Sequence, residues 1–197
     1  MINNLLKILV MFFGLGLLNH TDAARPMLTD DARIVDPKSC QLESWVRDSK
    51  HVTEYWALPA CNVGENLEVT IGGSLESQGG HSSFANELYQ IKSILQPIAL
   101  NQTGFSIVLG NGRDPKRAMN KAIQDWYLNV PMSYPYNDRL VIHTNLGVTH
   151  LTDEHKEKMN WGLSSEYNYN ERIDLISEVF NQSSNSTFFQ FGLRYWL

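Results

Sequence analysis

The sequence predicts an all-β fold, an antiparallel transmembrane β-barrel of about ten strands. Three observations carry this prediction. The chain begins with an export signal, its remaining length divides into ten segments in which apolar and polar residues alternate, and the last segment, Phe188 to Leu197, sets an apolar row against a polar one. Alternation with a period of two indicates a strand whose two faces meet different surroundings, and such strands span membranes when they close a barrel.

Residues 1–23 have the pattern of a secretory signal peptide. Met1 to Lys7 carries one lysine, Ile8 to Leu18 is an apolar run of 11 residues, and Asn19 to Ala24 is polar and then small. Cleavage is expected near Ala23 or Ala24. The alternative, an N-terminal membrane helix, needs about 20 apolar residues. We therefore expect the mature chain to lie outside the cytoplasm.

The composition gives no support for nucleic-acid binding, because the net charge is −5 and no basic patch occurs. Removal of the signal takes away one lysine and one aspartate, so the net charge stays the same. Hydrophobic residues make up 43% of the chain and aromatic residues 11%. These values suit a barrel with an apolar outer face and a polar lumen, and they also permit one soluble domain.

Residues 24–39 are expected to form an irregular periplasmic leader, because Pro26, Pro37 and several charges occur there without periodicity. The β-barrel domain then occupies residues 40–197. Strands of about nine to twelve residues are close to the length that a tilted strand needs to cross a bilayer, and an even number allows antiparallel closure. The predicted strands are 40–48, 53–61, 66–76, 85–96, 103–111, 126–135, 139–150, 159–169, 172–181 and 187–197.

The alternation assigns one set of polar residues to the inner face of the barrel. Leu67, Val69 and Ile71 face one way, for example, while Glu68 and Thr70 face the other. A soluble β-sandwich also alternates, so it is strand length and loop pattern that favour the barrel. We expect the inner residues to form a hydrogen-bonded structural network rather than a selectivity filter. This lumen network comprises Glu68, Glu76, Lys92, His143, Glu166, Asp174, Glu178 and Arg194.

The predicted connections between strands are four, four, eight, six, fourteen, three, eight, two and five residues long. From the third onward, the odd-numbered connections are longer than those beside them, as in outer-membrane barrels with short periplasmic turns. The longest runs from Gly112 to Asp125, where Ala118, Met119 and Ala122 have helical spacing with Ile123. This spacing predicts a short helix at the mouth of the barrel, and a mobile external loop is the alternative.

Cys40 and Cys61 are the two cysteines, and both belong to the exported part of the chain. If strands 40–48 and 53–61 form a hairpin in which paired positions sum to 101, Trp45 lies opposite Trp56 and Cys40 lies opposite Cys61. Directly opposed Cα atoms can be about 4.5 Å apart, which a disulfide spans. In an oxidising periplasm we expect a disulfide with a structural role. Free thiols are the alternative.

The last predicted strand has an outward row that resembles the C-terminal signal read by outer-membrane assembly machinery. This row consists of Phe189, Phe191, Leu193, Tyr195 and Leu197. Other aromatic residues near strand ends are candidates for the girdles at the membrane interfaces, although in a soluble fold they would belong to the core. These candidates are Trp45, Trp56, Trp126, Trp161, Trp196, Tyr134, Tyr167, Tyr169 and Tyr195.

No motif points to catalysis, a cofactor or a metal. His150 and His155 are five residues apart, which is not the spacing of a helical zinc site. Neither a nucleophile elbow nor a phosphate loop occurs. A serine, a histidine and an acid could still meet in three dimensions. We expect a protein without catalytic, cofactor-binding or metal-binding residues.

Four stretches together resemble a family of uncharacterised proteobacterial outer-membrane β-barrel proteins, which are grouped with transporter-like proteins of aromatic pathways. They are Ala24 to Trp45, Thr53 to Cys61, Asp138 to Gly147, and Phe188 to Leu197. The resemblance implies location and fold rather than a substrate. Members of this family usually continue for about two further strands, so either a ten-stranded barrel closes with strand 187–197 or the chain is a C-terminally shortened member.

These expectations describe a monomeric barrel in the outer membrane of a Gram-negative bacterium. It would contact lipid and the barrel assembly machinery, and it would pass or recognise a small molecule, apolar or aromatic in character. The alternative is a soluble periplasmic β-barrel of lipocalin type that binds an apolar ligand. In that fold the apolar faces would point inward and the charged residues outward.

Overall fold

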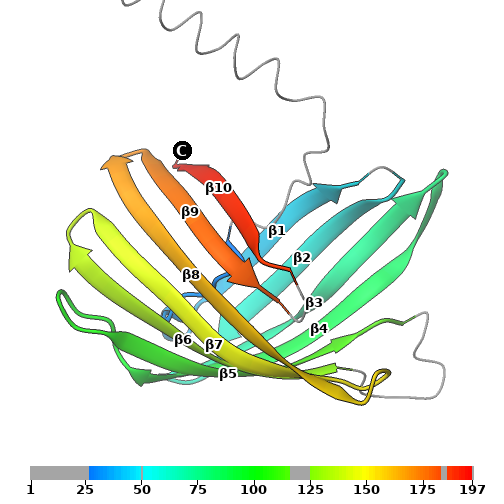
Figure 1. Ribbon diagram of the computed structural model, residues 1–197, viewed down its shortest axis with the longest axis horizontal. Helices are drawn as coiled ribbons and strands as arrows, with labels where there is room; N and C mark the ends of the chain where they lie inside the picture. Colours follow the sequence, from blue (N-terminus) through cyan, green and yellow to red (C-terminus); the bar gives the residue numbers. More distant parts are fainter. Residues whose placement is uncertain (1–26, 50, 116–124, 183–185, 197) are drawn as a thin grey trace, which may run out of the picture.

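Ten strands follow one another along the chain, and each hydrogen-bonds to the next in one antiparallel sheet (Figure 1). The computed structural model describes residues 27–49, 51–115, 125–182 and 186–196. The predicted signal peptide, the predicted helix around Ala118 to Ile123, and Leu197 lie outside these residues. The strands are β1 (Cys40–Asp48), β2 (Thr53–Asn62), β3 (Leu67–Gln78), β4 (His81–Gln96), β5 (Gly104–Arg113), β6 (Asp125–Asn137), β7 (Leu140–Leu151), β8 (Lys156–Asn170), β9 (Ile173–Asn181) and β10 (Phe188–Tyr195).

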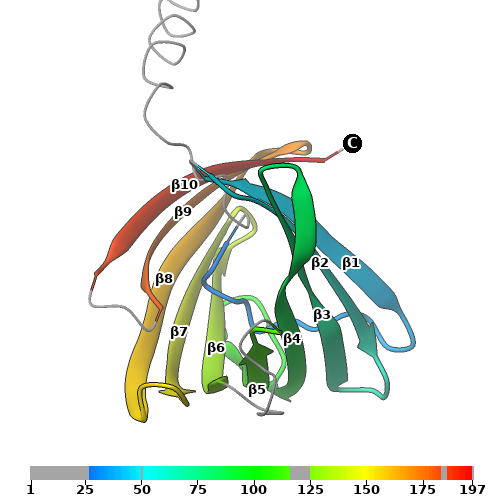
Figure 2. The ribbon, with the colours of Figure 1, turned by 90° about the vertical axis from the view of Figure 1, so that its right-hand side faces the viewer.

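The sheet curves into a half-barrel with a concave and a convex face (Figures 1 and 2). The prediction of an all-β antiparallel fold with ten strands is confirmed. Closure is not seen: within the described residues β1 pairs with β2 alone and β10 pairs with β9 alone. These two strands are therefore the edges of the sheet. Of the described residues, none belongs to a helix long and apolar enough to cross a membrane.

The hairpin of β1 and β2 has the predicted register. Trp45 lies opposite Trp56, and Cys40 lies opposite Cys61. The two cysteines form a disulfide, with their Cα atoms 4.1 Å apart. The predicted disulfide is thus confirmed, and it ties the edge strand β1 to its neighbour.

The hairpin of β3 and β4 differs from the prediction. An eight-residue connection was expected, but the two strands continue to a turn of two glycines, Gly79 and Gly80. Their φ angles are +57° and +83°. A two-residue turn with positive φ at both positions matches the right-handed twist of paired strands, and glycine adopts such angles without steric cost. The expected rule that odd-numbered connections are the longer ones fails at this turn.

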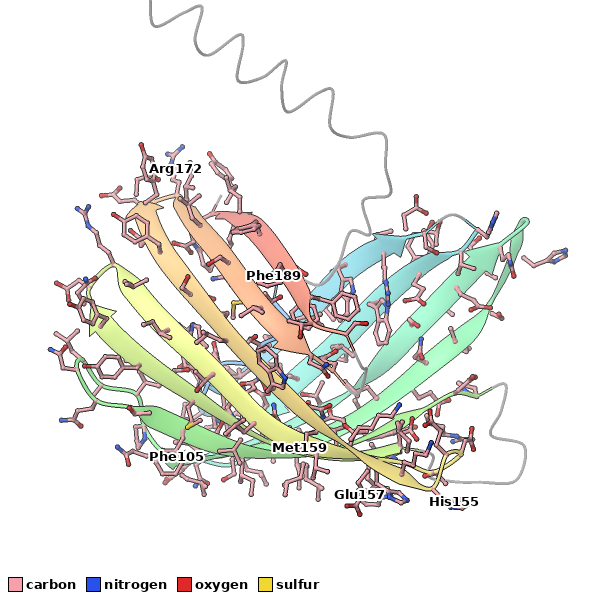
Figure 3. The ribbon with its side chains drawn as sticks, viewed as in Figure 1. Phe105, His155, Glu157, Met159, Arg172 and Phe189 are labelled. Atoms are coloured by element: carbon pink, nitrogen blue, oxygen red, sulfur yellow. A yellow bond between two sulfur atoms is a disulfide. The ribbon has the colours of Figure 1, made fainter. Side chains whose placement is uncertain are left out.

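The two faces of the sheet have opposite chemical character. Phe191 and Met159 on the convex face are 84% and 73% exposed, whereas Glu68 and Lys92 on the concave face are 5% and 4% exposed. Figure 3 shows Phe105 and Met159 on the outer side of the curve. Most large apolar side chains of the strands thus face outward, and the buried charged ones face inward.

Residues 27–39, the inner segment, lie inside the half-barrel (Figure 2). These residues form bends and one turn but neither a strand nor a helix, in keeping with their irregular composition. The described residues of the predicted irregular leader thus lie across the concave face. Thr29 and Ala32, each 1% exposed, are among its most deeply buried residues. The interior of the half-barrel is therefore built from two parts, the wall of strands and the inner segment.

Candidate functional site

Most of the lumen network lies together on the concave face, where it holds the inner segment. Six members are less than 10% exposed: Glu68, Lys92, His143, Glu166, Asp174 and Glu178. Arg194 is half-buried and pairs with two of them. Glu76 is separate, because it lies near the far end of β3, opposite Glu54 and Ser83.

Lys92 on β4 joins the wall to the inner segment. Its Nζ lies 2.9 Å from Oδ1 of Asp30 and 3.7 Å from Oδ1 of Asp31. Burial acts to raise the pKa of Asp31, but the positive charges of Lys92 and Arg33 outweigh it and hold the pKa below its usual value. The two carboxylates of the segment thus compensate the buried ammonium group.

Glu68 faces Lys92 directly across the β3–β4 ladder and binds the main chain of the inner segment. Its Oε2 accepts the N–H of Val35 at 2.8 Å. The side-chain amide of Asn62 on β2 donates to the carbonyl oxygen of Val35 at 2.7 Å. Both main-chain groups of Val35 are therefore satisfied by side chains of the wall.

Glu178 on β9 holds the other end of the segment. Its carboxylate accepts the N–H of Leu28 at 3.0 and 3.1 Å, and Oε2 also accepts the N–H of Thr29 at 2.9 Å. Hydrogen bonds to a charged acceptor are stronger than neutral ones. Glu68 and Glu178 therefore anchor the segment on strands that lie toward opposite edges of the sheet.

Ser133 and His143 meet at the middle of the wall. Oγ of Ser133 accepts the N–H of Ala32 at 2.8 Å and lies 2.8 Å from Nδ1 of His143. A serine and a histidine therefore do come together, as the sequence left open. Both are 0% exposed, and the hydroxyl is already engaged with Ala32. A nucleophile has to reach its substrate, so in this arrangement the pair serves to hold the segment.

Arg194 on β10 forms a second cluster near the edge. Its guanidinium lies 3.0 and 3.2 Å from the two oxygens of Glu166 and 3.6 Å from Asp174. Arg33 of the inner segment approaches Glu166 at 3.9 Å. Asp174 also accepts the indole N–H of Trp196 at 2.8 Å. This cluster ties β10 to β8 across β9, a bidentate arrangement that suits a half-buried arginine.

The inner segment also fits the wall by shape, at Gly162 on β8. A Cβ atom added at Gly162 would lie 2.5 Å from Oγ1 of Thr29. The φ of Gly162 is not positive, unlike that of Gly79 and Gly80, so its backbone does not require glycine. The space is needed for Thr29 instead.

Four wall residues that hold the segment were missed as site residues: Asn62, Ser133, Asn145 and Gly162. With its amide oriented to satisfy both groups, Asn145 bonds the main-chain N–H and C=O of Asp30 at 2.6 and 2.8 Å. Alternation places Ser133 and Asn145 on the inner face. Their partners could not be found that way, because the segment itself has no periodicity.

The aromatic residues divide between the two faces. Trp45 and Trp56 were candidates for a membrane girdle, but they stack with ring centroids 5.3 Å apart on the face that carries Leu58 and Asn62. That face is the concave one, so the prediction was wrong for this pair. Trp196 binds Asp174 of the network. Tyr167, Tyr169 and Tyr195, by contrast, are exposed.

Other features of the described residues offer no further site chemistry. Within them no group of three or more His, Cys, Asp and Glu side chains could hold a metal ion. An open hollow of about 540 Å³ lies at the turn between β8 and β9, where Figure 3 marks Arg172. It is lined by Arg139, Asn168, Tyr169, Asn170, Glu171 and Arg172.

Comparisons with known proteins give a family but no activity. The family model described as "Uncharacterised conserved protein UCP029691" matches residues 13–197 of the chain. A search of curated proteins found no match.

Proposed function

We propose that this chain, which belongs to the family of uncharacterised conserved proteins just described, is an outer-membrane β-barrel protein that passes or recognises a small molecule. The family description names neither a location nor an activity. The proposal therefore rests on one observation, the polarity of the sheet. Its convex face is apolar and exposed, and its concave face is charged and buried.

This polarity suits lipid as the outer solvent. Most soluble proteins bury apolar side chains and keep charged ones in water, and a lipocalin-type fold would do so. Here Phe189 and Leu193 are exposed on the convex face while Glu178 and Lys92 are buried on the concave one. An apolar surface that extends over the strands of a sheet is typical of contact with a membrane or a partner. Alternation with the apolar residues outward is the pattern of membrane barrels.

The positions of the exposed tyrosines also support the proposal. β6, β8 and β10 run in the same direction, because each is separated from the next by one antiparallel strand. Their C-terminal ends therefore lie at the same end of the sheet, and those ends carry Tyr136, Tyr169 and Tyr195, all more than half exposed. Aromatic residues gathered at one level are typical of a membrane interface.

A bilayer would require partners for both sheet edges, because unpaired main-chain groups are costly in hydrocarbon. β1 and β10 run antiparallel to each other, which is the orientation that direct pairing needs. We include this closure in the proposed membrane state. It would place the lumen network and the inner segment inside a complete barrel.

The lining of the interior favours a polar solute. Of the charged network residues in contact with the inner segment, Glu68, Glu166 and Glu178 are acidic and Lys92 is basic. An apolar or aromatic molecule, which we expected from the sequence, could not replace the hydrogen bonds that these groups make with the inner segment. The interior is also largely filled, so a wide general pore does not suit it.

Membrane fractionation of the exported chain tests the proposal. We expect recovery in the outer-membrane fraction, resistance to carbonate washing, and release by detergent. As a matched control, a soluble periplasmic protein exported by the same signal should appear in the osmotic-shock fluid. Recovery of the mature chain from that fluid without detergent would remove the membrane proposal.

A further inference from the structure

The inner segment is attached to the wall in a way that allows it to leave. Between Leu28 and Val35, the described hydrogen bonds that join it to the strands all use wall side chains, those of Glu178, Lys92, Ser133, Asn145, Glu68 and Asn62. Ladder hydrogen bonds, by contrast, are made among β1 to β10. Release of residues 28–35 therefore breaks no strand pairing, while the carbonyl oxygen of Ser39 at the end of the segment still accepts the N–H of Asn62 at 3.0 Å.

The attachment is nevertheless specific. Lys92, with a side chain 5% exposed, has its nearest carboxylates in Asp30 and Asp31 of the segment. Gly162 provides a space that Thr29 fills. Charge and shape thus fix the segment at two separate points, on β4 and on β8.

We propose that the inner segment is a displaceable plug, which closes the lumen when docked and opens it to small solutes when released. This inference rests on the proposed function, because a plug needs a closed barrel around it. In the docked state Thr29 lies against Gly162, and Asp30 and Asp31 lie against Lys92. In the released state the sheet persists, and the wall groups are hydrated by lumen water.

The test measures KCl conductance of the purified full-length chain in planar bilayers. Gly162→Val fills the space of Thr29 and should raise the time-averaged conductance about tenfold or more, since a Cβ contact of 2.5 Å cannot be kept. Gly112→Val is the matched control. Gly112 also lies in a strand, but a Cβ added there meets nothing within 4 Å, so conductance should stay at the wild-type level.

A second variant avoids any change in the strands. Asp30→Asn with Asp31→Asn removes both carboxylates from Lys92 and should also raise conductance about tenfold or more, because an unpaired buried ammonium disfavours the docked state. Into this background, Thr29→Cys with Gly162→Cys can introduce a lock. A Cβ at position 162 would lie 3.3 Å from that of Thr29, close to disulfide geometry.

The locked protein should not conduct when oxidised and should conduct when reduced. Wild-type protein treated with the same reductant controls for reduction of the Cys40–Cys61 disulfide. Two results would overturn the plug. One is that the Gly162→Val and Asp30→Asn/Asp31→Asn proteins, once inserted in the bilayer, both conduct no more than the wild type; the other is that the oxidised, locked protein still conducts. Insertion is scored separately by carbonate-resistant recovery with vesicles. A chain that does not insert overturns the proposed function, and with it the plug.

Discussion

Nζ of Lys92 and Oδ1 of Asp30 lie 2.9 Å apart, although the two residues are separated by 62 positions in the sequence. Lys92 is fixed in the middle of the sheet by its ladder to β3 and β5. Asp30 belongs to a segment with no ladder. This ion pair therefore connects the sheet to a part of the chain that is held by side-chain contacts. Removal of the one charge or of the other should lower the free energy of unfolding by different amounts.

Removing the carboxylates should cost more than removing the ammonium. We expect Asp30→Asn with Asp31→Asn to lower the free energy of unfolding by about 3 kcal/mol, because the docked state then buries Lys92 without these partners and the released state gives up the contacts of the segment. Lys92→Met should cost less, since the side chains of Asp30 and Asp31 are 23% and 24% exposed and can turn to water. Urea unfolding in detergent micelles, followed by tryptophan fluorescence, measures both. A larger loss for Lys92→Met would contradict this account.

An arginine on the convex face should distinguish lipid from water. Leu163 lies midway along β8 and is 46% exposed. In a bilayer, Leu163→Arg should destabilise the protein by about 2–4 kcal/mol, whereas on a water-exposed surface the change would stay within about 0.5 kcal/mol. Leu100→Arg, also exposed but outside the strands, is the control. Unfolding in vesicles is the measurement, and equal small effects would speak for a soluble protein.

Acid should weaken the docking of the inner segment through Asp31. The folded pKa of Asp31 lies below its usual value of 3.8, because Lys92 and Arg33 outweigh the effect of burial. A lowered folded pKa contributes stability that is present above pH 3.8 and is lost as the pH falls through the folded pKa. The stability difference between wild type and Asp31→Asn should therefore shrink below pH 3.8. Asp138→Asn, in the turn between β6 and β7, controls for a charge lost elsewhere, and a difference independent of pH would refute the assignment.

The two-glycine turn should resist substitution. Gly80 has a φ of +83°, so Gly80→Ala is expected to destabilise the protein by about 1 kcal/mol through backbone strain. Gly64 lies in another turn without a positive φ, and a Cβ there meets nothing within 4 Å. Gly64→Ala should be neutral or slightly stabilising. Thermal unfolding of the two variants compares them directly, and equal effects would show that the turn relaxes.

The strands could be predicted because alternation is a local signal. The disulfide could be predicted because the register of one hairpin pairs the two cysteines. Leu67, Glu68 and their neighbours alternate, and a two-strand register places Cys40 opposite Cys61. The turn at Gly79 and Gly80 carried a recognisable signal as well, since paired glycines are typical of tight hairpins. The residues on both sides of the two glycines are polar, so the apolar alternation stops before the turn, and the strands were predicted to end too early.

The place of the inner segment could not be predicted in the same way. Its contacts are main-chain N–H groups on distant side chains, such as Val35 on Glu68 and Thr29 on Glu178. Such contacts leave no periodic trace, because every residue other than proline offers the same N–H. The inward position of Trp45 and Trp56 was missed for another reason, because an aromatic residue suits either face of a strand. The face is set by position: Trp56 is an even number of residues from Asn62 on β2, and Trp45 lies opposite Trp56.

The order of residues along the chain gives the contacts of Glu178 a consequence for assembly. Leu28 and Thr29 bind a carboxylate that follows them by about 150 positions. Because synthesis runs from the N-terminus, the inner segment is made long before β9 exists to receive it. Contacts between such distant positions form late. The part of the protein that is made first therefore docks last, and its docking completes the assembly rather than beginning it.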